Sequence, residues 1–159
     1  MQSSPLQLED YLLRRLRFGL VSPLNDMLDP SVIYDPLDVD INAETRNRND
    51  DPLLWRTELV VRSRDEKEGT YPYTFELVYV GFFRVVKEFP AERVEQMVRA
   101  NAPALLYSAA REALLYLTGR GRLPAVLLPS VTFIEPPPSQ PTKGKKSGAR
   151  RAQKTAKKK

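Results

Sequence analysis

The side chains that could do chemistry in this sequence are carboxylates, because its 159 residues include no His and no Cys. A His-assisted nucleophile, a reactive thiolate and a zinc site of imidazole or thiolate ligands are therefore excluded. The nearest group of oxygen ligands, Asp35, Asp38, Asp40 and Asn42, lacks the central Gly and the terminal Glu of a calcium-binding loop. We interpret it as the solvated edge of a strand, and we expect no catalytic residue, no metal and no other cofactor.

Large apolar side chains beside charged ones are the second kind of candidate, because they can bind another polypeptide. Trp55 stands next to Arg56 and close to Glu58, which we expect to face water. A Trp on a partly exposed strand is typical of protein contacts. We predict that Trp55, Leu59 and Val61 bind a client polypeptide; the alternative, an ordinary packing role for Trp55, stays open.

The last part of the chain carries the strongest charge. Residues 136–159 contain nine Lys and Arg and no acid, so residues 1–135 keep 16 of the 25 basic groups against 20 acidic ones. The body therefore has a net charge of −4, although the whole chain has +5. The composition of 136–159 predicts a disordered basic tail. It is either a solubilising extension or a polyanion-binding segment, with Lys143, Lys145, Lys146, Arg150 and Arg151 as its contacts.

Residues 1–135 are enough for one domain, which can bury roughly two thirds of the surface of the unfolded chain without disulfides or metals. Residues 1–30 show no positive segment followed by an apolar one, and no run approaches the ~20 apolar residues of a membrane span. The lack of Cys fits a reducing compartment. We therefore expect a cytoplasmic protein.

Four segments are expected to form strands. Leu37–Ala43 alternates apolar and polar residues, and Leu53–Val61 is rich in β-branched and aromatic ones. Tyr71–Val86 is a longer strand, joined to Leu53–Val61 as a hairpin through a charged turn, and both of its faces are largely apolar. Gly81 within it indicates a bulge or the close approach of another backbone. Leu6–Leu20 fits a helical stripe and a strand; we favour a strand for its second half, since three strands would leave a long apolar edge exposed.

Helical segments are expected to follow the strands. Pro is favoured at the first helical position, so we expect a short helix from Pro90 and a longer one from Pro103, which Gly119 ends. The apolar segment Leu123–Phe133 contains two prolines. We expect it to be extended and to pack against the body.

Five short motifs stand in a fixed order in the second half of the chain. They are Gly81-Phe82-Phe83, Ala102–Tyr107, Ala110-Arg111-Glu112, Thr118–Pro124 and Leu127–Phe133. Over roughly residues 75–133 this order and spacing resemble the SecB family of protein-export chaperones. The resemblance implies an α+β fold, with a four-stranded antiparallel sheet followed by a short and a long helix. It also implies a dimer of dimers that holds unfolded polypeptides in apolar grooves without nucleotide.

The strand Tyr71–Val86 and the longer helix contain the residues that we expect to build the core or an oligomer interface. Glu76 points to the opposite face of that strand, where it is either a salt-bridge partner or a docking contact. The core or interface residues are Tyr73, Phe75, Leu77, Tyr79, Arg111 and Glu112.

The chain departs from the family pattern where SecB proteins contact the SecA motor. The family carries acidic residues in the first strand, and this chain has Arg17 and Val21 there, although Glu76 keeps the acid of the later strand. SecB proteins also tend to be strongly acidic and to end in another helix, whereas this chain ends in a basic tail. The sequence therefore argues against docking to SecA. The wider family includes chaperones dedicated to an antitoxin.

We predict a homotetrameric, ATP-independent chaperone of the holdase type. Its partners would be unfolded polypeptides, either preproteins on their way to protein export or a dedicated client such as an antitoxin. The alternative is a nucleic-acid-associated adaptor that uses the SecB-like fold for oligomerisation and the basic tail for polyanion binding.

Overall fold

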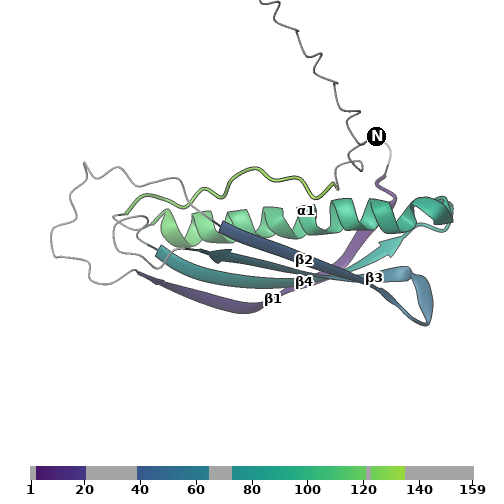
Figure 1. The fold of residues 1–159 in the computed structure, drawn as a ribbon, viewed down its shortest axis with the longest axis horizontal. Coiled ribbons are helices and arrows are strands. Elements are labelled where there is room, and N and C mark those ends of the chain that lie inside the picture. The colour runs from purple at the N-terminus through teal and green to yellow at the C-terminus, as the bar shows by residue number, and fades with distance from the viewer. Residues whose placement is uncertain (1–2, 21–38, 65–72, 121–122, 135–159) are drawn as a thin grey trace, which may run out of the picture.

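The computed structural model describes residues 3–20, 39–64, 73–120 and 123–134. Its elements follow in the order β1 (Leu6–Leu20), β2 (Val39–Arg48), β3 (Asp51–Ser63), β4 (Tyr73–Val85) and α1 (Ala91–Thr118). The strands form one antiparallel sheet of order β1-β4-β3-β2. The helix lies along one face of this sheet, and residues 123–134 run back along the helix (Figure 1). The α+β class and the four-stranded antiparallel sheet are thereby confirmed.

The strand β1 is extended over its whole length, so the helical alternative for its first half is wrong. Its pairing with β4 shifts register twice, between Leu8 and Asp10 and between Leu13 and Arg15. Each shift inserts one residue and restarts the alternation of faces. The apolar residues therefore recur at mixed steps of two and three, which resemble a helical stripe.

One continuous helix replaces the short and the long helix expected from the sequence. α1 spans 28 residues and contains Pro103, which is fully buried. Pro103 removes one backbone hydrogen bond from the helix, but its ring packs within the core. Gly119 ends the helix as predicted: its N–H donates to the carbonyl of Leu115 at 2.8 Å. A Cβ on Gly119 would lie only 2.7 Å from that oxygen.

The core lies between the sheet and α1. Gly81 of β4 allows a close contact there, because a Cβ at this position would lie 2.7 Å from the Phe83 ring and 2.8 Å from Leu106 of the helix. The bulge expected at Gly81 is not found, since the register shifts occur in β1, and the neighbour that approaches is a side chain rather than a backbone. The largest fully buried side chains are Phe83, Leu59, Leu77, Leu106, Leu114, Val61, Val85, Val98, Val126, Thr57, Thr118 and Pro103.

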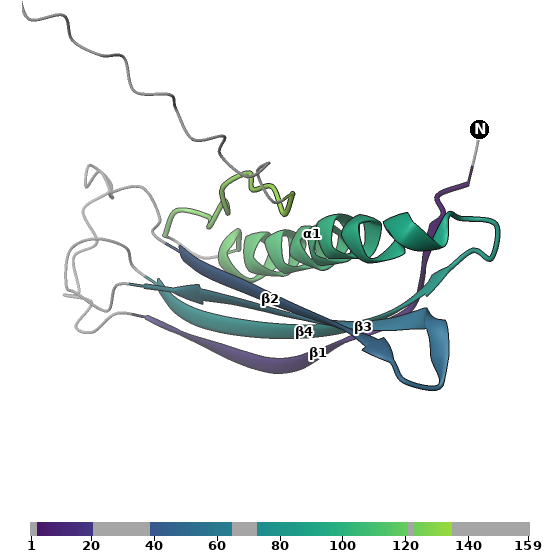
Figure 2. The ribbon, with the colours of Figure 1, turned by 45° about the vertical axis from the view of Figure 1, so that its right-hand side comes forward.

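The extended segment after the helix packs on the body, as predicted, and Figure 2 shows it along α1. The Tyr107 hydroxyl donates a hydrogen bond to the carbonyl of Pro129 at 2.7 Å, and the Tyr107 ring meets Phe133 edge-on at 6.0 Å. The N–H of Val126 donates to the hydroxyl of Thr118 at 2.8 Å. Burial raises the pKa of Tyr107, so its hydroxyl stays a donor at neutral pH.

Several expectations fall on residues outside the described ranges. They concern the basic tail, the domain boundary at residue 135, the turn over 65–69, and the residues Val21, Asp35 and Asp38. Among the described residues, no helix is long and apolar enough to cross a membrane.

Candidate polypeptide-binding surfaces

The three residues predicted to bind a client are buried, so the partly exposed position expected for Trp55 is wrong. Trp55, Leu59 and Val61 are 9%, 0% and 0% exposed. All three point toward α1, whereas Arg56 and Glu58 point to the other face because side chains alternate along a strand. The water-facing neighbours of Trp55 therefore report on the opposite side of the sheet. They carry no information about the surroundings of the indole.

The core residues expected on β4 are confirmed. Tyr73, Phe75, Leu77 and Tyr79 are at most 5% exposed. By contrast, the two helix residues predicted with them, Arg111 and Glu112, are exposed. Within the described ranges no ion pair or hydrogen bond ties either of these two to the sheet, so the helix-to-sheet contact expected of them is not found. Their role at a subunit interface stays a prediction.

An exposed apolar surface lies on β1 and is here called the β1 row. Its side chains are each between 38% and 49% exposed, although they point to the same face of the sheet as the core. Register with β4 fixes their direction: Leu16 stands opposite Leu77, and Phe18 opposite Phe75. The row consists of Leu8, Tyr11, Leu13, Leu16, Phe18 and Leu20.

A stripe on α1 adjoins the β1 row. Leu105, Ala109, Glu112 and Tyr116 are spaced by four, three and four residues, which places them on one side of the helix. Leu105 is 45% and Tyr116 60% exposed. Glu112 identifies the side: burial, and then the charges of Tyr11 and Glu112, raise the pKa of Tyr79 on β4.

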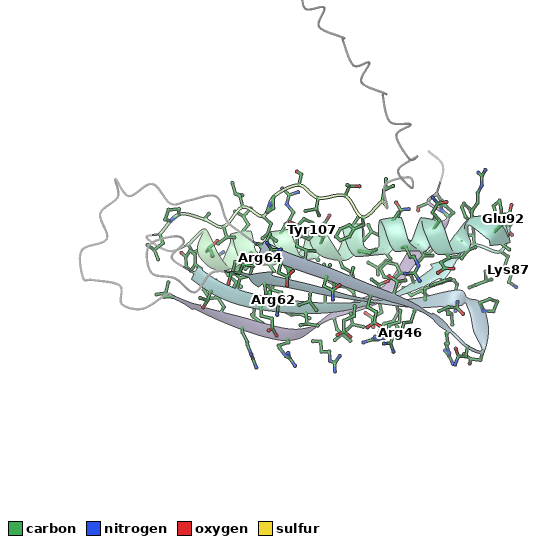
Figure 3. All side chains as sticks on the ribbon, in the orientation of Figure 1. Arg46, Arg62, Arg64, Lys87, Glu92 and Tyr107 are labelled. Atoms are coloured by element: carbon green, nitrogen blue, oxygen red, sulfur yellow. The ribbon has the colours of Figure 1, made fainter. Side chains whose placement is uncertain are left out.

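A groove lies between the first turns of α1 and the end of the extended segment, and is here called the α1 groove. It has a volume of about 730 Å³. Phe89, Met97, Phe133 and Ile134 provide its apolar lining, and charged residues of α1, including the labelled Glu92, border it (Figure 3). Ile134 is 66% exposed, and Leu127 further along the same segment is 68% exposed. The groove can therefore accept apolar side chains of another chain.

Ion pairs cover the face of the sheet turned away from α1. Arg15 donates to Glu76 at 2.9 Å, and Arg14 donates to Glu58 at 3.1 Å. The hydrogen bond from Arg15 lowers the pKa of Glu76, and Arg56, helped by Arg14, lowers that of Glu58. Of the two roles predicted for Glu76, the structure shows the salt bridge. Docking through Glu76 stays a prediction.

The described residues contain no group of three or more acids or other ligands that could hold a metal ion. Neither the β1 row nor the α1 groove was predicted from the sequence. The alternation of Leu16, Phe18 and Leu20 was the available signal for the first, and no local pattern marked the second.

The fold and these surfaces define a class: an α+β protein in which one helix covers only part of a four-stranded antiparallel sheet. A family model described as preprotein translocase subunit SecB matches residues 29–135. This match covers more than half of the sequence. The chain therefore belongs to the SecB family.

Curated relatives carry the same family name. A protein-export protein SecB from Bradyrhizobium diazoefficiens is 30% identical over 98 residues, which are 62% of this chain and 59% of that protein. The corresponding protein of Nitrobacter winogradskyi is 31% identical over 100 residues, 62% of this chain and 60% of that protein. The chain thus spans about 60% of the length of these relatives.

A solved structure shares the fold. The SecB-like chaperone of Mycobacterium tuberculosis, determined in complex with a peptide from an antitoxin, has a TM-score of 0.55 and 18% sequence identity to this chain. The similarity covers 80% of this chain and 91% of that one.

Proposed function

We propose that this protein is an ATP-independent chaperone of the holdase type, which binds unfolded polypeptides in the α1 groove and works as an oligomer in the cytoplasm. The observation that carries the proposal is the apolar surface left open on a chain of the SecB family. The proposal includes no catalytic step, in keeping with a sequence that has neither His nor Cys.

The β1 row and the adjoining α1 stripe form the oligomer interface in this proposal. β1 is an edge strand, so its outer backbone groups pair with no other strand among the described residues, and such apolar edges are covered in soluble proteins. Each large side chain contributes about 1.5–3 kcal/mol when fully buried. Six half-exposed side chains therefore supply enough free energy for association. A second copy fits best, because a two-fold axis presents the same row twice, and two such dimers would give the predicted dimer of dimers.

The α1 groove is the client site in this proposal. Its apolar lining and the exposed Leu127 and Ile134 can contact many different apolar side chains through weak, additive contacts. Charged residues of α1 at its border keep it soluble when empty. These properties suit an unfolded chain without a fixed sequence. Trp55, Leu59 and Val61 support the site only indirectly, as part of the core beneath α1.

The client is either a preprotein or a dedicated partner such as an antitoxin. The curated relatives are named for protein export, and the fold neighbour was solved with an antitoxin peptide. Docking to SecA receives no support from the outer sheet face, because Glu76 is hydrogen-bonded to Arg15 and stands beside Arg17.

The test is equilibrium binding of a fluorescently labelled, reduced and unfolded protein to the full chain, followed by anisotropy without nucleotide. We expect binding that nucleotide does not change and that persists at about 1 M salt, where the Debye length is only ~3 Å. A natively folded, disulfide-intact sample of the same protein is the matched control and should not bind. Failure to bind the unfolded protein, or its loss at high salt, would contradict the groove mechanism.

A further inference from the structure

The outer face of the sheet, turned away from α1, is rich in arginine. The four strands contain no Lys, so every cation on them is an Arg. Six arginines gather around three carboxylates and are here called the outer arginine patch. Figure 3 shows nitrogen-tipped side chains projecting from this side of the sheet. The patch consists of Arg14, Arg15, Arg17, Arg56, Arg62 and Arg64 around Asp40, Glu58 and Glu76.

Two of the three carboxylates are shared by cations from neighbouring strands. Glu58 lies 3.1 Å from Arg14 of β1 and is also paired with Arg56 of its own strand. Glu76 accepts a hydrogen bond from Arg15 at 2.9 Å. In the sheet register Glu76 also stands between Arg17 on β1 and Arg62 on β3. Each of these acids is therefore neutralised more than once.

Asp40 at the β2 edge repeats this arrangement. Its carboxylate lies 2.6 Å from Arg62 and 3.9 Å from Arg64, both labelled in Figure 3. Glu44 stands opposite Glu58 in the register of β2 and β3 and is paired with Arg46, and Glu9 is paired with Arg84. Among the described residues, Arg14, Arg15, Arg17, Arg56 and Arg62 outnumber the neighbouring acids Asp40, Glu58 and Glu76.

The cations are the outermost groups of the patch. The side chains of Arg14, Arg15 and Arg62 are 54–58% exposed, whereas the carboxylate side chains are only 22–31% exposed. A guanidinium has five N–H donors. An approaching molecule therefore meets N–H donors before it meets carboxylate oxygens.

We propose that the outer arginine patch docks an acidic segment of a partner protein, at a site separate from the α1 groove and the β1 row. Arginine forks bind planar carboxylates through paired hydrogen bonds. Val60 of β3 is half-buried and lies in register between Val78, which is buried, and Asn42 on β2, so the patch has a small apolar centre at Val60. Apolar side chains of a protein segment can contact this centre, and a phosphate backbone cannot, which favours an acidic protein over a nucleic acid.

The experiment uses the full chain and a short fluorescent peptide of alternating Glu and Val. The same peptide with Gln in place of Glu is the uncharged probe, and a single-stranded oligonucleotide is the competing polyanion. The variants are Arg15→Glu with Arg17→Glu, and the milder pair Arg15→Gln with Arg17→Gln. Arg48→Glu is the matched control, because Arg48 is an exposed arginine paired with Asp50 at the far end of the sheet.

We expect the acidic peptide to bind in a salt-sensitive way and the Gln peptide not to bind. Charge reversal at positions 15 and 17 should weaken binding at least ~10-fold and the Gln pair should weaken it less, since like charges oppose docking; Arg48→Glu should have no effect. The basic tail is common to all variants, so the ratio between them reports on the patch. Thermal unfolding verifies that each variant is folded.

Equal binding by wild type and by the folded charge-reversal or Gln variants would overturn the proposal. Equal binding of the Gln peptide would overturn it as well. If the oligonucleotide displaced the acidic peptide and depended more strongly on Arg15 and Arg17, the patch would be a nucleic-acid surface instead.

Discussion

The strands β4 and β1 present the same kind of surface to the same side of the sheet, with opposite results. Leu77 on β4 is fully buried, and Leu16, directly opposite on β1, is 44% exposed. Phe75 is 4% exposed, while its neighbour Phe18 is 38% exposed. Both strands carry large apolar side chains on this face. The difference is that the helix covers β4 and leaves β1 open.

This contrast shows that the same row of apolar side chains can serve two purposes. On β4 the apolar row stabilises the single chain. On β1 the same row gains little within the chain and is available to another polypeptide, which in our account is a second copy. The predictions below test this division, beginning with the largest expected effect.

The paired leucines give the largest contrast. Leu77→Ala should lower the free energy of unfolding by about 2–5 kcal/mol, because it leaves a cavity in the core. Leu16→Ala should cost much less in the single chain, where the side chain is half solvated. Urea denaturation at several protein concentrations measures both. An equal loss for the two variants at low concentration would erase the distinction between the strands.

A charge in the β1 row should break the oligomer. Leu16→Asp places a carboxylate in the proposed interface and removes a contribution of about 1.5–3 kcal/mol from each copy. Leu12→Asp is the matched control, since Leu12 is also 44% exposed and lies on the same strand, but faces the other side. Light scattering coupled to gel filtration should find smaller particles for Leu16→Asp only. If Leu12→Asp dissociated the oligomer instead, the interface would lie on the outer face of the sheet and the assignment to the β1 row would be wrong.

A substitution in the α1 groove tests whether its exposed apolar side chains contact the client. Ile134→Ser should weaken binding of a reduced, unfolded protein about tenfold, which corresponds to ~1.4 kcal/mol. Because Ile134 is 66% exposed, the fold should not change. Anisotropy titration measures the affinity, with Leu12→Ser as the control on the outer face. Unchanged binding by Ile134→Ser would contradict the assignment of client binding to the α1 groove.

The smallest effect concerns pH and the outer face. The hydrogen bond from Arg15 holds the pKa of Glu76 below its ordinary value of 4.5. A lowered pKa in the folded state means that the stabilisation is present above pH 4.5 and is lost as the pH falls through the folded-state pKa. Arg15→Gln should therefore flatten the decline in unfolding free energy below pH 4.5. An unchanged pH profile would show that this pair contributes nothing.

The sequence predicted the architecture because its main signals are local. The alternation in β2, the β-branched and aromatic residues of β3 and β4, the stop at Gly119 and the packing of the segment after α1 all follow from short-range patterns. Pro103 was predicted to begin a second helix, because a proline inside a helix removes a backbone hydrogen bond. Burial of its ring in the core compensates for that loss, and the helix continues. The two bulges of β1 obscured its alternation in the same way.

The surfaces were harder to predict than the fold. The exposure of a strand depends on whether the helix covers it. The side chains that β1 turns toward the helix side of the sheet are as apolar as those of β4, so the sequence does not show which of the two strands is covered. Trp55 was placed on the wrong side because its charged neighbours face the opposite layer. The α1 groove joins Met97 with Phe133 and Ile134, residues far apart in the chain that only the packed segment brings together.

The most direct test of the account is site-specific photo-crosslinking to a reduced, unfolded client. A photoreactive residue would replace Ile134 in the α1 groove, Leu16 in the β1 row or Leu12 on the outer face, each in the full chain. We predict client crosslinks from position 134, crosslinks between copies of the chain from position 16, and neither from position 12. Client crosslinks from position 12 without any from position 134 would contradict the assignment of client binding to the α1 groove.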